Sequence, residues 1–219
     1  MEWIYLVLLM VLLGTNAFVP TIKSRQKVYL DREPLFTAKS PRVALTREEG
    51  ANEEIMALLQ GLECVELPCI DFTEGEDYVR LESELSLHDV VVVSSPQSAR
   101  VVSKVWSRAG KSPLKVVSVG KGTTLVLEKA GISPVFEPSN AMAEVLANEL
   151  PRSLGNSILY PTSNLAADTL QNGLESRGFE VTRLDTYTTQ PSIWTRQQLD
   201  TAQGMDVVAF ASPSAVRTW

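Results

Sequence analysis

Residues 89–100, DVVVVSSPQSAR, return in varied form at residues 206–217 as DVVAFASPSAVR. Each copy begins with an aspartate, runs through four apolar residues and reaches a Ser-Pro pair. Four apolar residues without alternation are typical of a strand that is buried on both faces of a parallel sheet. Proline cannot continue a central strand, but it suits the first turn of a helix. Each copy therefore predicts a buried strand followed by a helix, with Ser95 or Ser212 at the junction.

The repeat gives these two serines more weight than either would have alone. In open α/β sheets, ligands bind at the edge where strands give way to helices. A Ser-Pro pair that only caps a helix is the plainer interpretation of a single copy. Two copies far apart in the sequence indicate two similar α/β units, so we expect ligand-binding edges at Ser95 and Ser212.

Composition excludes several classes of protein. The chain has 219 residues, 44% of them hydrophobic, and a formal net charge of −6, which argues against a nucleic-acid-binding surface. Cys64 and Cys69 would lie roughly 16 Å apart on one extended strand, too far for a disulfide. One histidine, His88, and two separated cysteines make a metal site improbable, and we predict none.

The first forty residues have the character of a targeting leader. Ile4 to Leu13 is uninterrupted and apolar, too short for a membrane-spanning helix and typical of the core of a signal peptide. From Phe18 to Arg47, seven lysines and arginines stand against only two acidic residues, as in a transit peptide. A plain secretory signal followed by a linker is the alternative.

The junction at residues 16–20, NAFVP, is similar to the Ala-Phe-Ala-Pro junction of two-part plastid leaders in algae with complex plastids. We therefore expect a signal peptide over residues 1–17, a transit-like leader over residues 18–40 and a plastid location. We expect no stable membrane span in the mature protein, and we exclude the leader from fold reasoning.

Strands and helices are predicted to alternate along the rest of the chain. This order indicates an α/β fold of parallel sheets with helices on both faces. Beside the two repeat copies, the predicted strands cover residues 42–46, 65–70, 115–119, 134–136, 157–160 and 179–184, and the predicted helices cover 47–61, 78–87, 123–129, 140–150, 163–177 and 194–202. Residues 71–77 are predicted to form an acidic loop. The sequence stops at Trp219 inside a predicted helix, so we expect the complete gene product to be longer.

The groups that could bind a ligand are hydroxyls and backbone amides at strand-to-helix junctions. Residues 120–124, GKGTT, follow a strand and open a helix, whose N-terminal amides would hold an anion. The segment is neither a Walker A loop nor a full dinucleotide fingerprint, and a tight glycine turn with a threonine cap explains it equally well. Ser95, Thr123 and Ser212 share the junction position, which suits binding of carboxylates.

Several short motifs carry a family resemblance when they are taken in order. The motifs are Thr46-Arg47 after a strand, Ser95-Pro96, Val119-Gly120-x-x-Thr123, Leu159-Tyr160-Pro161, Thr186-Tyr187-Thr188-Thr189 and Ser212-Pro213-Ser214-Ala215-Val216. Together they give residues 41–219 a resemblance to the uroporphyrinogen-III synthase family. None of them is specific alone; their order and spacing are.

The resemblance implies two similar parallel-sheet α/β domains joined by a two-stranded linker. Residues 41–68 with 190–219 would form one discontinuous and incomplete domain, and residues 76–182 the inserted one. The linker strands would be residues 65–70 and 179–187.

The resemblance also implies an enzyme without a cofactor, a cyclising hydro-lyase of haem and chlorophyll biosynthesis. Such an enzyme, expected to be monomeric, converts linear hydroxymethylbilane to uroporphyrinogen III with loss of water and inversion of ring D. Tyr187 matches the implicated tyrosine, a hydrogen-bond donor to the leaving hydroxyl. Gly120 and Arg47, with the three junction hydroxyls of Ser95, Thr123 and Ser212, match substrate-binding positions.

One departure and three alternatives accompany this hypothesis. The family's second Gly-x-x-Thr motif is absent. An acidic chain that binds an octa-acid needs local donors, for which Lys121 and Arg47 are candidates. The alternatives are an anion-binding α/β module without chemistry, an inactive synthase fragment, and a nucleotide-binding enzyme that uses the GKGTT turn.

Overall fold

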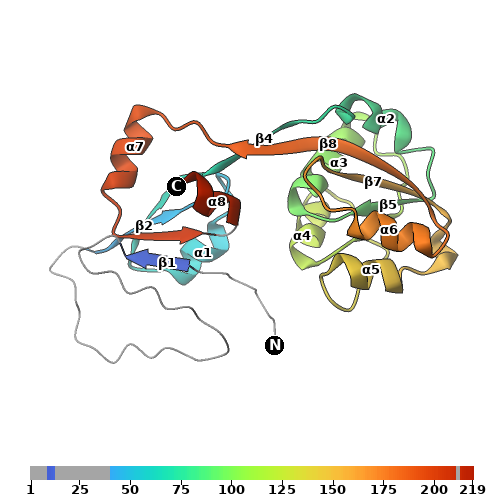
Figure 1. Cartoon of the computed structure of the whole chain (residues 1–219), viewed down its shortest axis with the longest axis horizontal. Coiled ribbons are helices and arrows are strands. Elements are labelled where there is room, and N and C mark those ends of the chain that lie inside the picture. Colours follow the sequence, from blue (N-terminus) through green and yellow to red (C-terminus); the bar gives the residue numbers. More distant parts are fainter. Residues whose placement is uncertain (1–8, 13–39, 211–212) are drawn as a thin grey trace. The chain divides into compact units, whose positions relative to one another are not determined.

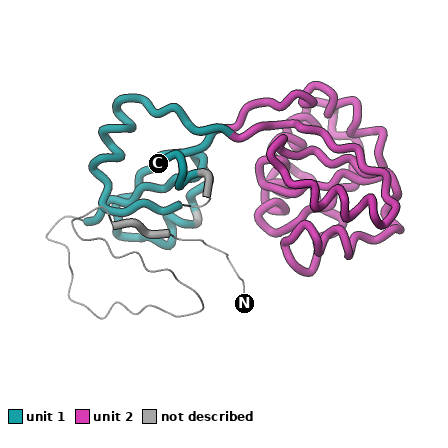
Figure 2. Tube along the Cα trace, in the orientation of Figure 1, with its two compact units in different colours: residues 1–71, 190–219 teal, residues 72–189 magenta. Residues whose placement is uncertain are grey.

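The computed structural model describes residues 9–12, 40–210 and 213–219, and the chain divides into two compact units (Figures 1 and 2). Unit 1 consists of residues 1–71 and 190–219, and unit 2 of residues 72–189. Both units are α/β, with mainly parallel sheets. Apart from residues 9–12 and 40, the expected leader lies outside the described residues.

Unit 2 is built on a five-stranded sheet of order β4-β8-β7-β5-β6. The pairs β5–β6, β5–β7 and β7–β8 are parallel. The strands are β4 (Ile70–Glu74), β5 (Val90–Val93), β6 (Val116–Ser118), β7 (Ser157–Ser163) and β8 (Glu180–Pro191). The first repeat copy is a buried strand followed by a helix, as predicted.

Helices cover both faces of this sheet (Figure 1). Val91 and Val93 of β5 pack in one core, with α2 (Leu81–Glu84), α3 (Pro96–Arg108) and α4 (Lys121–Lys129). Val90 and Val92 pack in the other core, with α5 (Ala143–Glu149) and α6 (Thr169–Ser176). Two 3-10 turns, Tyr78–Arg80 and Arg152–Leu154, complete the unit. Because each side of the strand has its own core, four consecutive valines are all buried.

Unit 1 contains a four-stranded sheet of order β1-β9-β2-β3. β2 pairs in parallel with β3 and β9, while β1 pairs antiparallel with β9. Its elements are β1 (Leu9–Leu12), β2 (Arg42–Leu45), α1 (Glu53–Leu58), β3 (Glu63–Glu66), α7 (Arg196–Gln203), β9 (Val207–Phe210) and α8 (Pro213–Thr218). The second repeat copy is therefore also a strand and a helix. Leu9–Leu12, which we excluded from the fold, forms an edge strand.

The repeated aspartate makes the same contacts in both units. Asp89 donates its N–H to the Ser157 carbonyl (3.0 Å), and its carboxylate accepts the Ser157 N–H (3.0 Å). Asp206 does the same with Arg42, at 2.9 and 2.8 Å. Ser157 and Arg42 are the first residues of the neighbouring parallel strands. The aspartate thus ties the start of its own strand to the start of the next one.

The prediction for residues 163–177 was wrong in its first third. β7 continues to Ser163, and α6 begins only at Thr169. The backbone of Ser163 pairs with Tyr187 of β8, after an irregularity in register, and this pairing keeps Ser163 in the strand. Leu165, expected to face inward, is 69% exposed, whereas Leu170 and Leu174 are buried as predicted.

The segment before unit 2 also differs from expectation. Val65 belongs to β3, which pairs with β2, so residues 65–70 are not one linker strand. Pro68 lies between β3 and β4, where its carbonyl accepts a hydrogen bond from the Trp194 indole (2.6 Å). The predicted loop at residues 71–77 is mostly strand, and the Gly75 N–H donates to the Thr186 carbonyl (3.0 Å). Val79, expected inside, is 80% exposed.

Candidate functional site at the edge of the unit 2 sheet

The site is centred on a hydrogen bond between Ser95 and Tyr187. Ser95 follows β5 in extended conformation and caps α3, where its Oγ accepts the Ser98 N–H (3.0 Å). Tyr187 lies on β8 opposite Ser163, where β7 ends. The Ser95 Oγ and the Tyr187 hydroxyl are 2.9 Å apart, although the residues are 92 positions apart in the sequence. Both residues therefore lie at the carboxyl edge of the sheet, where ligands bind in such folds.

The surroundings of Tyr187 keep its phenol neutral. The side chain is only 6% exposed, and the Phe72 ring packs edge-on against it, with ring centroids 5.8 Å apart. Burial raises the pKa of the Tyr187 phenol above 10.0, and the hydrogen bond with Ser95 offsets part of this rise. At neutral pH the group is therefore a proton-bearing donor within a mainly apolar wall.

A second phenol lies beside the neighbouring serine. Ser94 Oγ lies 3.4 Å from the Tyr160 hydroxyl, and Thr162 Oγ1 lies 3.3 Å from it. Tyr160 packs in the core with α5 and α6, whereas Tyr187 packs in the core with α3 and α4. Two consecutive serines thus contact phenols from opposite faces of the sheet. The sequence showed Tyr160 only as part of a motif and gave no sign of this pairing.

The GKGTT turn lies next to Ser95. Gly120 caps α4, and a Cβ on it would lie 2.7 Å from the Ala141 Cβ, so close packing favours glycine there. A Cβ on Gly122 would lie 3.9 Å from the Pro96 ring, which brings the first turns of α3 and α4 together. Thr123 is 4% exposed.

An acidic side chain lies at the same turn. Thr124 Oγ1 donates to the Glu137 carboxylate (2.5 Å) and is hydrogen-bonded to Ser118 Oγ (2.5 Å). A substrate carboxylate at this turn would meet Glu137, so the turn is a less favourable anion site than the sequence indicated.

The other two candidates do not belong to unit 2. Arg47 is half-buried and follows β2 in unit 1, next to Thr46, whose hydroxyl donates to the Ala209 carbonyl (2.8 Å). Ser212 lies outside the described residues. Among the predicted residues, the structure therefore brings together Ser95, Gly120, Thr123 and Tyr187.

A cavity of about 260 Å³ opens beside Tyr187, and sequence reasoning missed it. Its lining includes Gln97, Arg100 and Lys104 of α3. These side chains recur at the spacing of one helix face, which adjoins the buried face of Ser98, Val101 and Val105. That periodicity was the available signal, since it separates a polar face of α3 from the core.

The described residues offer neither a cluster of metal ligands nor a reactive thiol at Cys69. They contain no group of three or more His, Cys, Asp and Glu side chains that could hold a metal ion. Cys64 and Cys69 are free, and burial raises the pKa of the Cys69 thiol to about 11. Within the same residues, no helix has the length and apolar character to cross a membrane.

Comparison with known proteins shows the family to which the chain belongs. A family model described as uroporphyrinogen-III synthase HemD matches residues 52–219. The chain is also 40% identical, over 197 residues, to the chloroplastic uroporphyrinogen-III synthase of Oryza sativa subsp. japonica. The chain belongs to the uroporphyrinogen-III synthase family. The resemblance drawn from the ordered motifs is therefore confirmed.

The family match is not end to end. The alignment with the rice protein covers 82% of this chain and 64% of that protein, so the chain spans less than two thirds of that relative's length. Two solved structures of the family are also similar. A mutant uroporphyrinogen III synthase of the bacterium Thermus thermophilus is 18% identical, with 70% of this chain and 64% of that chain covered and a TM-score of 0.49. The Helicobacter pylori enzyme is 12% identical, with 74% and 67% covered and a TM-score of 0.49.

Proposed function

We propose that the protein is a uroporphyrinogen-III synthase, which cyclises hydroxymethylbilane to uroporphyrinogen III with loss of water and inversion of ring D. This reaction would place it in tetrapyrrole biosynthesis. The observation that carries the proposal is the family match over residues 52–219, together with 40% identity to a relative of that name. The Ser95–Tyr187 pair adds a chemical device that suits the reaction.

The difficult step is departure of the terminal hydroxyl group. The carbon–oxygen bond breaks as the oxygen receives a proton and leaves as water, the nitrogen of the same pyrrole ring gives up its N–H proton, and that ring becomes an electrophilic azafulvene. A neutral phenol can supply a hydrogen bond to the leaving oxygen. In this proposal Tyr187 is that donor, and Ser95 holds its hydroxyl in place at 2.9 Å.

Ring closure then depends on positioning. The substituted carbon of ring D attacks the azafulvene carbon and forms a spiro intermediate. The older bond from that ring D carbon to the bridge carbon of ring C then breaks. The free α-carbon of ring D bonds to this bridge carbon and loses its proton, which inverts ring D and closes the macrocycle. Holding the two ends in reacting geometry is a large part of such catalysis. We assign substrate contacts to Ser95, Thr123, Gly120, Arg47 and Ser212, with graded rather than all-or-none effects when single groups are removed.

The two units suit the domain organisation inferred from the resemblance. The division of the chain falls within β4 and within β8. We propose that these strands form the two-stranded linker between a discontinuous domain and an inserted domain. This assignment replaces residues 65–70, of which Val65 and Glu66 belong to β3. We further propose that the enzyme acts as a monomer on its small-molecule substrate, without a cofactor.

We propose a plastid location, reached through a signal peptide at residues 1–17 and a transit-like leader at residues 18–40. The rice relative is named chloroplastic, which supports the destination. A fluorescent protein fused behind residues 1–47 should reach the plastid of an alga with complex plastids. Secretion of the fusion would contradict the transit function.

The function is tested by supplying hydroxymethylbilane and separating uroporphyrin isomers III and I after oxidation. The chain without its first forty residues should be run beside a version extended from the transcript. Isomer III above the uncatalysed background from either protein supports the proposal. Isomer I alone from both is the uncatalysed outcome and would favour an anion-binding module.

A further inference from the structure

The cavity beside Tyr187 carries an inference about how the substrate is held. Its volume is about 260 Å³. That space suits one pyrrole side chain or ring edge, but not a whole linear tetrapyrrole. We therefore considered which chemical group the lining would select.

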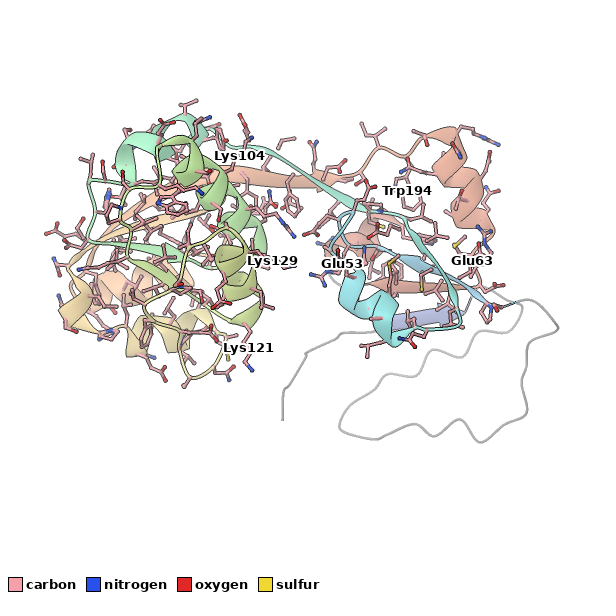
Figure 3. The ribbon with its side chains drawn as sticks, turned by 180° about the vertical axis from the view of Figure 1, so that it is seen from behind. Glu53, Glu63, Lys104, Lys121, Lys129 and Trp194 are labelled. Carbon is pink, nitrogen blue, oxygen red and sulfur yellow. The ribbon has the colours of Figure 1, made fainter. Side chains whose placement is uncertain are left out.

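The lining is basic in an acidic protein. Arg100 and Lys104 contribute positive charge and Glu74 contributes negative charge, whereas the whole chain has a net charge of −6. Arg100 Nη1 also donates to Gln97 Oε1 (3.2 Å), which orients the guanidinium along the α3 face. Lys104, marked in Figure 3, lies on α3 and well apart from Lys121 at the start of α4. A locally basic cavity selects an anion.

Lys104 is held only weakly. Its ammonium lies 3.7 Å from the Glu74 carboxylate, and the two side chains are 69% and 62% exposed. Ion pairs this exposed contribute little to stability, so Lys104 can exchange Glu74 for a ligand carboxylate at small cost. The ammonium also lies 5.5 Å from the centre of the Tyr78 ring, which is part of the same wall.

Tyr78 provides an independent observation. Its side chain is 6% exposed, and its buried hydroxyl has no hydrogen-bond partner among the described residues. A buried hydroxyl without a partner is destabilising, and such groups are rare in folded proteins. A ligand carboxylate that reaches this hydroxyl would give it an acceptor.

We propose that this cavity is a carboxylate-binding subsite, in which Arg100, Lys104 and the Tyr78 hydroxyl hold one acidic side chain of the tetrapyrrole beside Tyr187. The inference rests on the proposed function and goes beyond it, because it assigns specificity to residues of α3 and the Tyr78–Arg80 turn. Anchoring a carboxylate here fixes the distance between one ring of the substrate and the Tyr187 phenol.

The test is binding of uroporphyrin III, an octacarboxylate, measured by porphyrin fluorescence anisotropy. Lys104→Gln should weaken binding about tenfold, because hydrogen bonds between charged groups are the strong ones. Lys129→Gln is the matched control. It removes the same charge from an exposed lysine in the last turn of α4, outside the cavity lining, and should leave binding within about twofold.

Tyr78→Phe separates ligand binding from a structural role. Removal of an unpaired buried hydroxyl should raise the melting temperature of the ligand-free chain, while binding of uroporphyrin III becomes several-fold weaker. Coproporphyrin III, with four fewer carboxylates, should bind more weakly than uroporphyrin III to the wild-type chain. The loss of affinity caused by Lys104→Gln should also be smaller for coproporphyrin III.

The outcomes distinguish this subsite from the function on which it rests. Wild-type binding that neither Lys104→Gln nor Tyr78→Phe weakens would overturn the subsite and leave the synthase proposal intact. Absence of uroporphyrin binding by the wild-type chain would also overturn the subsite. The synthase proposal is decided separately, by formation of isomer III from hydroxymethylbilane.

Discussion

Tyr187 shows how one side chain acquires a chemical role from its surroundings. Burial against Phe72 raises the phenol pKa, and the Ser95 hydroxyl, 2.9 Å away, partly opposes this effect. Burial disfavours ionisation of the phenol, and the hydrogen bond with Ser95 holds the phenol oxygen in place. A donor that is both neutral and oriented at pH 7 is what departure of a hydroxyl group requires.

The pKa of Tyr187 leads to a titration experiment. Its folded-state pKa lies above 10.0, so its contribution to stability is complete below pH 10 and is lost as the pH rises through the folded value. The difference in tyrosinate absorbance between wild type and Tyr187→Phe should therefore appear only above pH 10. In Ser95→Ala, which lacks the bond that lowers the pKa, the transition should move further up. A transition below pH 10 would contradict the described burial.

Cys69 leads to a second prediction at this scale. Its side chain has no exposed surface, and burial raises the thiol pKa to about 11, so almost no thiolate is present at pH 8. Native protein should therefore react with a thiol reagent at Cys64 before Cys69, and Cys69 should react only as the chain unfolds. Cys64→Ser isolates the second reaction. Fast labelling of Cys69 in the native Cys64→Ser protein would show that unit 1 is not packed as described.

What the sequence could predict at the residue scale follows from the range of the interactions. The junction positions of Ser95 and Gly120 were predictable, because proline suits the first turn of a helix and glycine permits tight turns. The contact of Ser95 with Tyr187 was not, since it joins residues 92 positions apart. The partnerless hydroxyl of Tyr78 was equally hidden, because it depends on packing with α3.

Elements were predicted best where a hydrophobic pattern determines them alone. The buried valines of β5 and the apolar face of α3 gave both elements correctly. The errors arose where pairing between strands decides the conformation. β7 is extended as far as Ser163 because β8 pairs with it, and β4 is a strand although its sequence is acidic. Long-range backbone hydrogen bonds left no mark in those local sequences.

The aspartate that begins each repeat copy was visible in the sequence, but its contacts with the neighbouring strand were not. Hydrogen bonds from the N–H groups of Ser157 and Asn156 lower the pKa of Asp89. A lowered pKa contributes stability that is present above pH 3.8 and lost as the pH falls through the folded value. Asp89→Asn should therefore reduce the melting temperature at pH 7, and the difference from wild type should shrink in acid.

Two further variants serve as controls for this experiment. Asp200→Asn changes the same charge at an exposed carboxylate that pairs with Arg196 on α7, and it should alter the melting temperature much less. Gly155→Ala should lower the melting temperature as Asp89→Asn does, because a Cβ on residue 155 would lie 2.1 Å from the Asp89 Cβ. Gly155 also has a φ of +144°, which strains any other residue. An Asp89→Asn protein that melts at the wild-type temperature at pH 7 would show that the strand-start contacts contribute nothing.

The whole molecule divides into one continuous and one discontinuous unit. Residues 72–189 hold a sheet with a separate apolar core on each face, whereas unit 1 needs both ends of the chain. We predict that residues 72–189 expressed alone unfold cooperatively in a thermal melt and retain Ser95, Tyr187 and the cavity. Because a Cβ on Gly75 would lie 2.1 Å from the Asp185 carbonyl oxygen, Gly75→Ala should disrupt this unit. A featureless melt of the wild-type segment would contradict its independence.

The central claim is that Tyr187 is the donor in cyclisation of hydroxymethylbilane, and one comparison tests it most directly. Formation of uroporphyrinogen III should be measured for wild type, Tyr187→Phe and Tyr160→Phe in the version extended from the transcript. Loss of a general acid typically costs about 10²-fold or more, so Tyr187→Phe should lose isomer III at least to that extent. Tyr160→Phe, which removes the other buried phenol of the same sheet, should remain within about tenfold of wild type. Unaltered turnover by Tyr187→Phe would contradict the account.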